Sequence, residues 1–217
     1  MTPEAVLFDF DFTLVDSSRG IVECVRCALL QLGFQPPPEE KILDTVGLSL
    51  ASTFRQLTGQ GSAEPAEQFT RLFHARADQV MDKMTLIYDS VQPVVRALRA
   101  AGVRTAIVST KLNRRIRSIL ATSQLEEWFD VIVGADDVLN PKPDPEGLLL
   151  ALRLLGVDPK SAVYVGDHVI DAQAASKSGI PFIATLSGRN PRGEFEPLPH
   201  IAIVGSVRDV PRILSLC

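Results

Sequence analysis

The chain has 217 residues, of which 46% are hydrophobic and 22% charged, a composition typical of a globular protein with room for one core domain and a modest insertion. Its formal net charge of −4 gives no bulk attraction for nucleic acid, so we expect no nucleic-acid partner. No apolar run is long enough to span a bilayer, and the opening MTPEAVLFDF lacks the basic start of a signal peptide. We therefore expect a cytoplasmic protein with no membrane partner.

The first part of the chain combines one strand with a long helical stretch. A buried strand is predicted at 5–10 (AVLFDF), because a short apolar run ends there in carboxylates. No strand pattern appears between residues 17 and 84. Helical patterns occupy this stretch instead, broken by prolines and glycines, at 17–33, 38–45, 49–58 and 64–84.

Strands and helices alternate through the rest of the chain. The predicted strands are 103–109, 131–134, 161–167, 181–185 and 201–204, with helices between the first four of them and a last helix at 206–216. Such alternation predicts a parallel sheet covered by helices on both faces. The Gly- and Pro-rich segment 186–200 is expected to be a surface loop.

The helical stretch interrupts this alternation directly after the first strand. We therefore predict an α/β fold in which residues 1–15 and 86–217 form a Rossmann-like core domain. Residues 16–85 are predicted to be a separate helical domain inserted into it.

Carboxylates follow two of the predicted strands. Asp9 and Asp11 follow the first strand, and Asp167 and Asp171 follow the strand at 161–167. Buried carboxylates are costly unless a cation compensates their charge, and Mg²⁺ prefers carboxylate oxygens. Taken singly, each pair has an ordinary alternative, because Asp-x-Asp is common in turns and an acidic residue at a helix start complements the helix dipole.

Two other motifs, at residues 109–111 and at Lys142, contain groups that can bind an anion. In Ser109-Thr110-Lys111, a small hydroxyl precedes free backbone N–H groups at a helix start, although an ordinary helix cap has the same pattern. Lys142 stands between prolines, which stiffen the backbone around it. A lysine held against a phosphate would use that rigidity, whereas a solvated lysine in a turn would not need it.

The four motifs together are more specific than any one of them. DFDFTLVDS (9–17), IVSTK (107–111), KPDP (142–145) and GDHVID (166–171) resemble the haloacid dehalogenase superfamily of hydrolases. Within it the chain resembles the phosphoglycolate-phosphatase-like branch, which also includes β-phosphoglucomutases and a pyrophosphatase. The resemblance covers essentially the whole chain, and it is specific for the superfamily rather than for a substrate.

The resemblance implies a phosphatase that uses Mg²⁺. Asp9 would attack phosphorus and become an aspartyl phosphate. Asp11 would protonate the leaving oxygen and then activate water. The implied phosphoryl-binding residues are Thr13, Ser109, Thr110 and Lys142. The implied metal ligands are Asp9, Asp11 through its backbone carbonyl, and Asp167, with Asp171 holding Lys142 or a metal-bound water.

The inserted helices resemble the helical cap of this branch. The turn at Gly47 and the side chain of Arg55 are candidates to touch the substrate, although a solvated helix face is the ordinary position for an arginine. Two positions depart from the usual pattern of the branch. Phe12 stands where Gly is usual, and His168 stands where a small hydroxyl residue is common.

We expect hydrolysis of a small phosphate monoester, with phosphoglycolate as the best single guess and a small phosphorylated metabolite as the partner. A monomer or a homodimer is expected. A sugar-phosphate mutase or a pyrophosphatase would use the same residues. A catalytically silent phosphometabolite-binding module is a further alternative, and the presence of every acidic and basic motif residue argues against it.

Overall fold

The computed structural model describes residues 2–216, which form two compact units. One unit comprises the chain up to Val15 and from Ile87 onward, and the other is Asp16–Leu86. The interpretation of the second unit as a cap domain stays a prediction.

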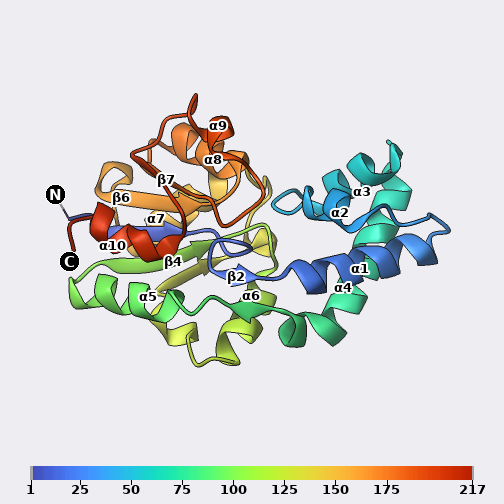
Figure 1. Cartoon of the computed structure of the whole chain (residues 1–217), viewed down its shortest axis with the longest axis horizontal. Coiled ribbons are helices and arrows are strands. Elements are labelled where there is room, and N and C mark those ends of the chain that lie inside the picture. The colour runs from blue at the N-terminus through green and yellow to red at the C-terminus, as the bar shows by residue number, and fades with distance from the viewer. Residues whose placement is uncertain (1, 217) are drawn as a thin grey trace. The chain divides into compact units, whose positions relative to one another are not determined.

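Six parallel strands form the sheet of the first unit (Figure 1). They are β1 (Ala5–Phe8), β4 (Arg104–Val108), β5 (Val131–Val133), β6 (Ala162–Gly166), β7 (Phe182–Thr185) and β8 (Ala202–Val204), in the spatial order β5-β4-β1-β6-β7-β8. All four residues of β1 are buried, as in a strand covered on both faces. The predicted parallel α/β sheet is confirmed.

Helices cover this sheet. The helices of the unit are α5 (Val91–Ala100), α6 (Asn113–Ala121), α7 (Glu146–Leu155), α8 (Val169–Ser178), α9 (Arg192–Phe195) and α10 (Val210–Ile213). Helices α7 and α8 pack against each other and against the strands, and α5 and α10 also pack against each other (Figure 1). Leu7, Leu148, Tyr164 and Phe182 belong to one buried cluster beneath α7 and α8.

Two segments of the first unit differ from expectation. The predicted loop 186–200 contains the short helix α9, which buries Phe195 completely. The predicted helix 206–216 is a 3₁₀ turn at Val207–Asp209 followed by the four residues of α10. The hydroxyl of Ser206 accepts the N–H of Arg208, which favours the tight turn over a regular helix start.

The second unit consists of α1 (Ser18–Gln31), α2 (Glu39–Leu43), α3 (Leu50–Thr58) and α4 (Ala63–Met84). Helix α4 packs along α1 and against α3. Phe54 of α3 and Phe69 of α4 have ring centroids 5.4 Å apart, and both rings are fully buried. The short strands β2 (Val15–Asp16) and β3 (Leu86–Ile87) pair where the chain passes between the units.

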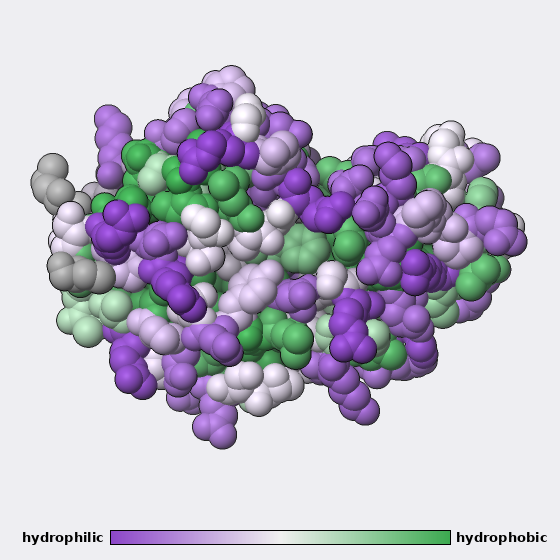
Figure 2. Space-filling model, in the orientation of Figure 1, coloured by the Kyte–Doolittle hydropathy of each residue, from purple (hydrophilic) through white to green (hydrophobic). Residues whose placement is uncertain are grey.

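The visible surface of each unit is mostly hydrophilic, with scattered hydrophobic patches (Figure 2). Within residues 2–216, no helix combines the length and the apolar character needed to cross a membrane.

The strand order places the loops that follow β4, β1 and β6 next to one another. The chain leaves β1 in one direction, toward β4 and β5, and later returns on its other side with β6, β7 and β8. This reversal next to β1 is the switch point at which open parallel sheets bind ligands, beyond the carboxyl ends of the strands.

Candidate active site

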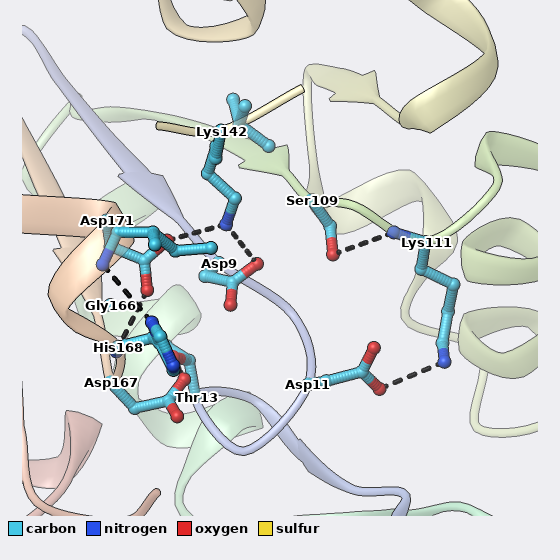
Figure 3. Close-up of polar contacts among 12 residues, drawn as sticks. Asp9, Asp11, Thr13, Ser109, Lys111, Lys142, Gly166, Asp167, His168 and Asp171 are labelled. Atoms are coloured by element: carbon cyan, nitrogen blue, oxygen red, sulfur yellow. Dashed lines mark hydrogen bonds and ion pairs between the residues drawn. The ribbon is translucent and has the colours of Figure 1, made fainter. Parts of the chain in front are cut away.

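The register of the sheet brings the acidic motifs together. Phe8 lies between Ile107 of β4 and Val165 of β6, so the loops after all three strands begin side by side. Asp9 therefore lies close to Asp167, and Ser109 is beside them (Figure 3). Lys142 reaches the same place from the segment before α7.

The ammonium of Lys142 lies between two carboxylates (Figure 3). Its Nζ is 2.8 Å from Oδ1 of Asp9 and 2.6 Å from Oδ1 of Asp171. It also donates to the hydroxyl of Tyr164 at 3.0 Å. Burial by itself would lower the pKa of Lys142, but the charges of Asp171 and Asp9 outweigh it and raise that pKa, so the lysine is cationic.

Negative charge still exceeds positive charge here. Carboxylate oxygens of Asp9, Asp167 and Asp171 lie within 4.8 Å of one another. Burial, reinforced by the charges of Asp171 and Asp11 and opposed by Lys142, raises the pKa of Asp9 to about 7. Burial also raises the pKa of Asp167, with the charges of Asp9 and Asp171 adding to it. Both carboxylates would be stabilised in their ionised form by a further cation.

The three carboxylates are not equally available to a metal ion. Oδ1 of Asp171 is taken by Lys142 and Tyr164, and Oδ2 accepts the N–H of His168 at 3.0 Å. By contrast, the buried Oδ1 of Asp9 accepts no hydrogen bond from the described residues and has only its ionic contact with Lys142. Asp9 and Asp167 thus fit a hard divalent cation, and Asp171 fits the supporting role beside Lys142. The backbone carbonyl of Asp11 stays a predicted ligand.

Asp171 and His168 form the start of α8. Nδ1 of His168 accepts the N–H of Ile170 at 3.2 Å, while Asp171 accepts the N–H of His168 in return. This reciprocal capping satisfies donors that a helix start leaves free. Burial lowers the pKa of His168, which favours the neutral ring that can accept a hydrogen bond. The unusual histidine therefore serves as a helix cap.

Thr13 supports Asp167. Its hydroxyl donates to Oδ1 of Asp167 at 2.6 Å, and its side chain is fully buried. A phosphate contact by Thr13 stays a prediction, because this hydroxyl is directed at the carboxylate.

Asp11 is paired with a second lysine. Nζ of Lys111 lies 3.0 Å from Oδ1 of Asp11, and both side chains are largely buried. The N–H of Lys111 donates to the hydroxyl of Ser109 at 3.3 Å. Figure 3 shows this pair apart from the cluster of Asp9, Lys142 and Asp171. Lys111 is part of the motif IVSTK, but no role was predicted for it from the sequence.

Two other contacts were not anticipated from the sequence. Tyr164 is completely buried, and its hydroxyl lies 3.0 Å from Oδ1 of Asp171 and 3.2 Å from the carbonyl oxygen of Val108. Gly188 lies against Asp167, since a Cβ on this glycine would come within 1.9 Å of Oδ2 of that carboxylate. A tyrosine in an apolar strand indicates only weakly that its hydroxyl has a buried partner. The sequence around Gly188 does not indicate a contact with Asp167.

Phe12 has a left-handed backbone conformation, with φ of 59°. Non-glycine residues adopt this region at a cost, which explains why glycine is usual at such a position. The N–H of Phe12 donates to the carbonyl of Val15 at 2.7 Å, closing the turn that follows Asp11.

Gly47 and Arg55 belong to the second unit. Gly47 has φ of 98° in the turn after α2, and Arg55 is an exposed residue of α3. Arg55 lines a pocket within that unit, together with Glu67 and Arg71. Contact of Gly47 or Arg55 with a substrate stays a prediction.

Comparison with known proteins agrees with this geometry. Residues 6–185 match the model of the haloacid dehalogenase-like hydrolases, which is most of the chain. The chain belongs to this family.

Individual relatives of this hydrolase cover nearly its whole length. A phosphoglycolate phosphatase from Salmonella typhi is 32% identical, over 85% of this chain and 82% of its own. The pyrophosphatase PpaX from Bacillus velezensis is 31% identical, over 89% of each chain. A solved structure described as a haloacid dehalogenase-like hydrolase from Bacteroides fragilis has 38% identity and a TM-score of 0.93, and the match covers 96% of this chain and 99% of the other. The predicted family and phosphatase class are confirmed.

Proposed function

We propose that this phosphatase hydrolyses small phosphate monoesters, using Mg²⁺ and an aspartyl phosphate on Asp9, with phosphoglycolate as the best single candidate. One observation carries the proposal. The carboxylate of Asp9 is buried at the carboxyl end of β1, where it contacts the ammonium of Lys142 and lies within 4.8 Å of carboxylate oxygens of Asp167 and Asp171. A carboxylate held in this way has the charge balance that attack on a phosphoryl group requires.

The first step transfers the phosphoryl group to the protein. A carboxylate oxygen of Asp9 forms a bond to phosphorus while the bond from phosphorus to the ester oxygen breaks. Asp11 gives its proton to the departing oxygen, which leaves as an alcohol. Asp9 then carries the phosphoryl group, and Asp11 is a carboxylate.

The second step returns Asp9 to its starting state. Asp11 removes a proton from water as the water oxygen attacks phosphorus. The bond between phosphorus and Asp9 breaks, which releases inorganic phosphate and restores both side chains. The same Asp11 thus acts first as acid and then as base.

The remaining residues bind and balance charge. The hydroxyl of Ser109 and the N–H of Thr110 would hold phosphoryl oxygens, and Lys142 would offset the charge of the phosphoryl group and Asp9. Mg²⁺, held by Asp9, Asp167 and the carbonyl of Asp11, would supply charge neutralisation and orientation of the phosphoryl group.

The choice of substrate rests on the relatives. They include phosphoglycolate phosphatases and a pyrophosphatase. Hydrolysis of phosphoglycolate releases glycolate, and hydrolysis of pyrophosphate releases phosphate. Both leaving groups are anions. A sugar-phosphate mutase would use the same residues and return the phosphoryl group to a sugar, and a silent binding module would need none of the proton transfers proposed for Asp11. A cytoplasmic location and a cap role for the second unit are part of the same proposal.

The test begins with Asp9→Asn. This variant should lose turnover of p-nitrophenyl phosphate and of phosphoglycolate to background, because an amide oxygen is a poor nucleophile toward phosphorus. Asp158→Asn, an exposed carboxylate at the amino end of β6, is the matched control and should keep full activity. Beryllium fluoride should inhibit the wild type as a mimic of the phosphorylated Asp9. Substantial turnover by pure Asp9→Asn would refute the mechanism.

Metal dependence and substrate are tested on the wild type. EDTA should abolish activity and Mg²⁺ should restore it, while Ca²⁺ should inhibit because its looser coordination misplaces the nucleophile. A panel of phosphorylated metabolites would rank phosphoglycolate against pyrophosphate and sugar phosphates. A rate indifferent to EDTA would exclude the metal assignment.

A further inference from the structure

The site contains two buried lysines, and phosphoryl transfer accounts for only one of them. Lys142 is shared between Asp9 and Asp171, next to the proposed nucleophile. Lys111 is equally buried, with 9% of its surface exposed, and its ammonium contacts Asp11 instead. A buried ammonium is costly unless it has a function or a counter-charge, so its position is informative.

Two contacts fix Lys111 relative to the reaction. Its backbone N–H donates to the hydroxyl of Ser109, which ties it to the loop proposed to bind phosphoryl oxygens. Its ammonium lies 3.0 Å from the carboxylate of Asp11, the group proposed to protonate the departing oxygen. In the proposed mechanism this contact puts Lys111 on the side of the leaving group. Figure 3 shows Lys111 apart from the Lys142 cluster.

We propose that Lys111 is a specificity-determining residue that selects substrates whose leaving group carries a negative charge near the ester oxygen. This inference rests on the proposed function. A carboxylate or a phosphate one or two bonds beyond that oxygen would come within ionic reach of Nζ while the oxygen itself contacts Asp11. A neutral alcohol would leave the ammonium with no substrate partner. Charge complementarity in a site sheltered from water discriminates strongly between such ligands.

A different role for Lys111 makes a different prediction. If the ammonium of Lys111 only holds Asp11 in place, removing that ammonium should lower kcat/KM for every substrate by the same factor. A specificity role requires the loss to depend on the charge of the leaving group. The ratio of kcat/KM between two matched substrates separates the two roles.

The substrates are 2-phosphoglycolate and 2-hydroxyethyl phosphate, which share the phosphate–oxygen–methylene linkage and differ in a carboxylate against a neutral hydroxymethyl group. Wild-type protein with Mg²⁺ should prefer phosphoglycolate by at least about tenfold in kcat/KM, and Lys111→Met should reduce that preference by about tenfold or more. Lys111→Arg keeps the charge and should retain most of the preference. Lys160→Met removes an exposed lysine at the amino end of β6, and it should match the wild type in both reactions.

Each outcome decides one point. Equal losses on both substrates in Lys111→Met would overturn the specificity role. So would a wild type that hydrolyses both substrates equally well, a measurement that does not depend on any variant folding. Lys111→Gln, checked by circular dichroism, replaces Lys111→Met if the latter is unfolded. A wild type that hydrolyses no phosphate ester, p-nitrophenyl phosphate included, would instead refute the proposed function.

Discussion

Thr13 and Asp167 lie 154 positions apart in the chain, and a buried hydrogen bond of 2.6 Å joins their side chains. The bond connects the loop after β1 to the loop after β6, and it supports the ionised form of a carboxylate that burial disfavours.

Thr13→Val should therefore weaken both the fold and the binding of Mg²⁺. It leaves a buried carboxylate without its donor, which should cost about 1–3 kcal/mol in the free energy of unfolding. Thr13→Ser keeps the hydroxyl and should recover most of the loss. Urea denaturation without metal measures the first effect, and calorimetric titration with Mg²⁺ measures the second. Wild-type values for Thr13→Val in both experiments would contradict the role assigned to this bond.

The pKa of Asp9 predicts how stabilisation by metal depends on pH. Burial raises this pKa from 3.8 to about 7, so the proton bound to Asp9 stabilises the metal-free fold at low pH, and that contribution is lost as the pH rises through about 7. A divalent cation competes with the proton for the same carboxylate. The gain in Tm on adding Mg²⁺ should therefore be larger near pH 8 than near pH 6.

Asp9→Asn provides the control for that experiment. It removes the titrating group, so much of the difference between the two pH values should disappear, leaving the part due to Asp167. A gain in Tm that is the same at both pH values in the wild type would show that metal and proton do not compete at Asp9.

Gly188 is predicted to be required for space rather than for backbone freedom. Its φ is not positive, so the backbone does not require glycine, yet a Cβ would lie 1.9 Å from Oδ2 of Asp167. Gly188→Ala should displace that carboxylate and weaken Mg²⁺ binding by about 10- to 100-fold, as expected for a residue that supports a metal ligand. The readout is calorimetric titration of the metal, without substrate.

Gly193 offers a matched control five positions later. It lies in α9, and a Cβ there would meet no atom within 4 Å. Gly193→Ala should bind Mg²⁺ as the wild type does. Indistinguishable metal affinities for Gly188→Ala and Gly193→Ala would show that the loop tolerates a side chain next to Asp167.

The predicted role of Arg55 concerns substrate choice. If Arg55 or the Gly47 turn touches the part of the substrate beyond the phosphate, Arg55→Ala should change the ranking of natural substrates. Activity on p-nitrophenyl phosphate should change much less, because that compound needs few contacts beyond its phosphate. Gln56→Ala, the next exposed residue of the same helix, is the control. Equal losses on all substrates would indicate damage to the fold, and no change would exclude Arg55 as a substrate contact.

The sequence could predict the sheet and the positions of its acidic residues for one physical reason. A strand buried on both faces is a continuous apolar run, and a carboxylate that ends such a run lies at the carboxyl edge of the sheet, where a cation can compensate its charge. Asp9 was therefore predicted to follow β1 and Asp167 to follow β6, as observed. The apolar pattern of a strand does not predict which side chains from other parts of the chain contact these carboxylates.

The unpredicted contacts are those between distant positions with ordinary local sequences. Tyr164 in an apolar strand resembles any core aromatic, and its hydroxyl bonds become visible only once Lys142 and Asp171 are in place. Gly188 resembles a turn residue, because its reason for being glycine is a carboxylate on another loop. Pairwise geometry of this kind depends on the folded sheet, which local patterns do not describe.

Asp171 belongs to two structures at once, since it caps the first turn of α8 and it is a counter-ion of Lys142. Fraying of this helix end would therefore remove one of the three partners of Lys142 and leave it with Asp9 and Tyr164, even while the sheet remained intact. Local opening and loss of catalytic competence become the same event, with a free energy that can be smaller than that of global unfolding. Heat should thus inactivate the enzyme reversibly at temperatures below its cooperative melting transition, and amide hydrogens at the start of α8 should exchange faster than those of β1.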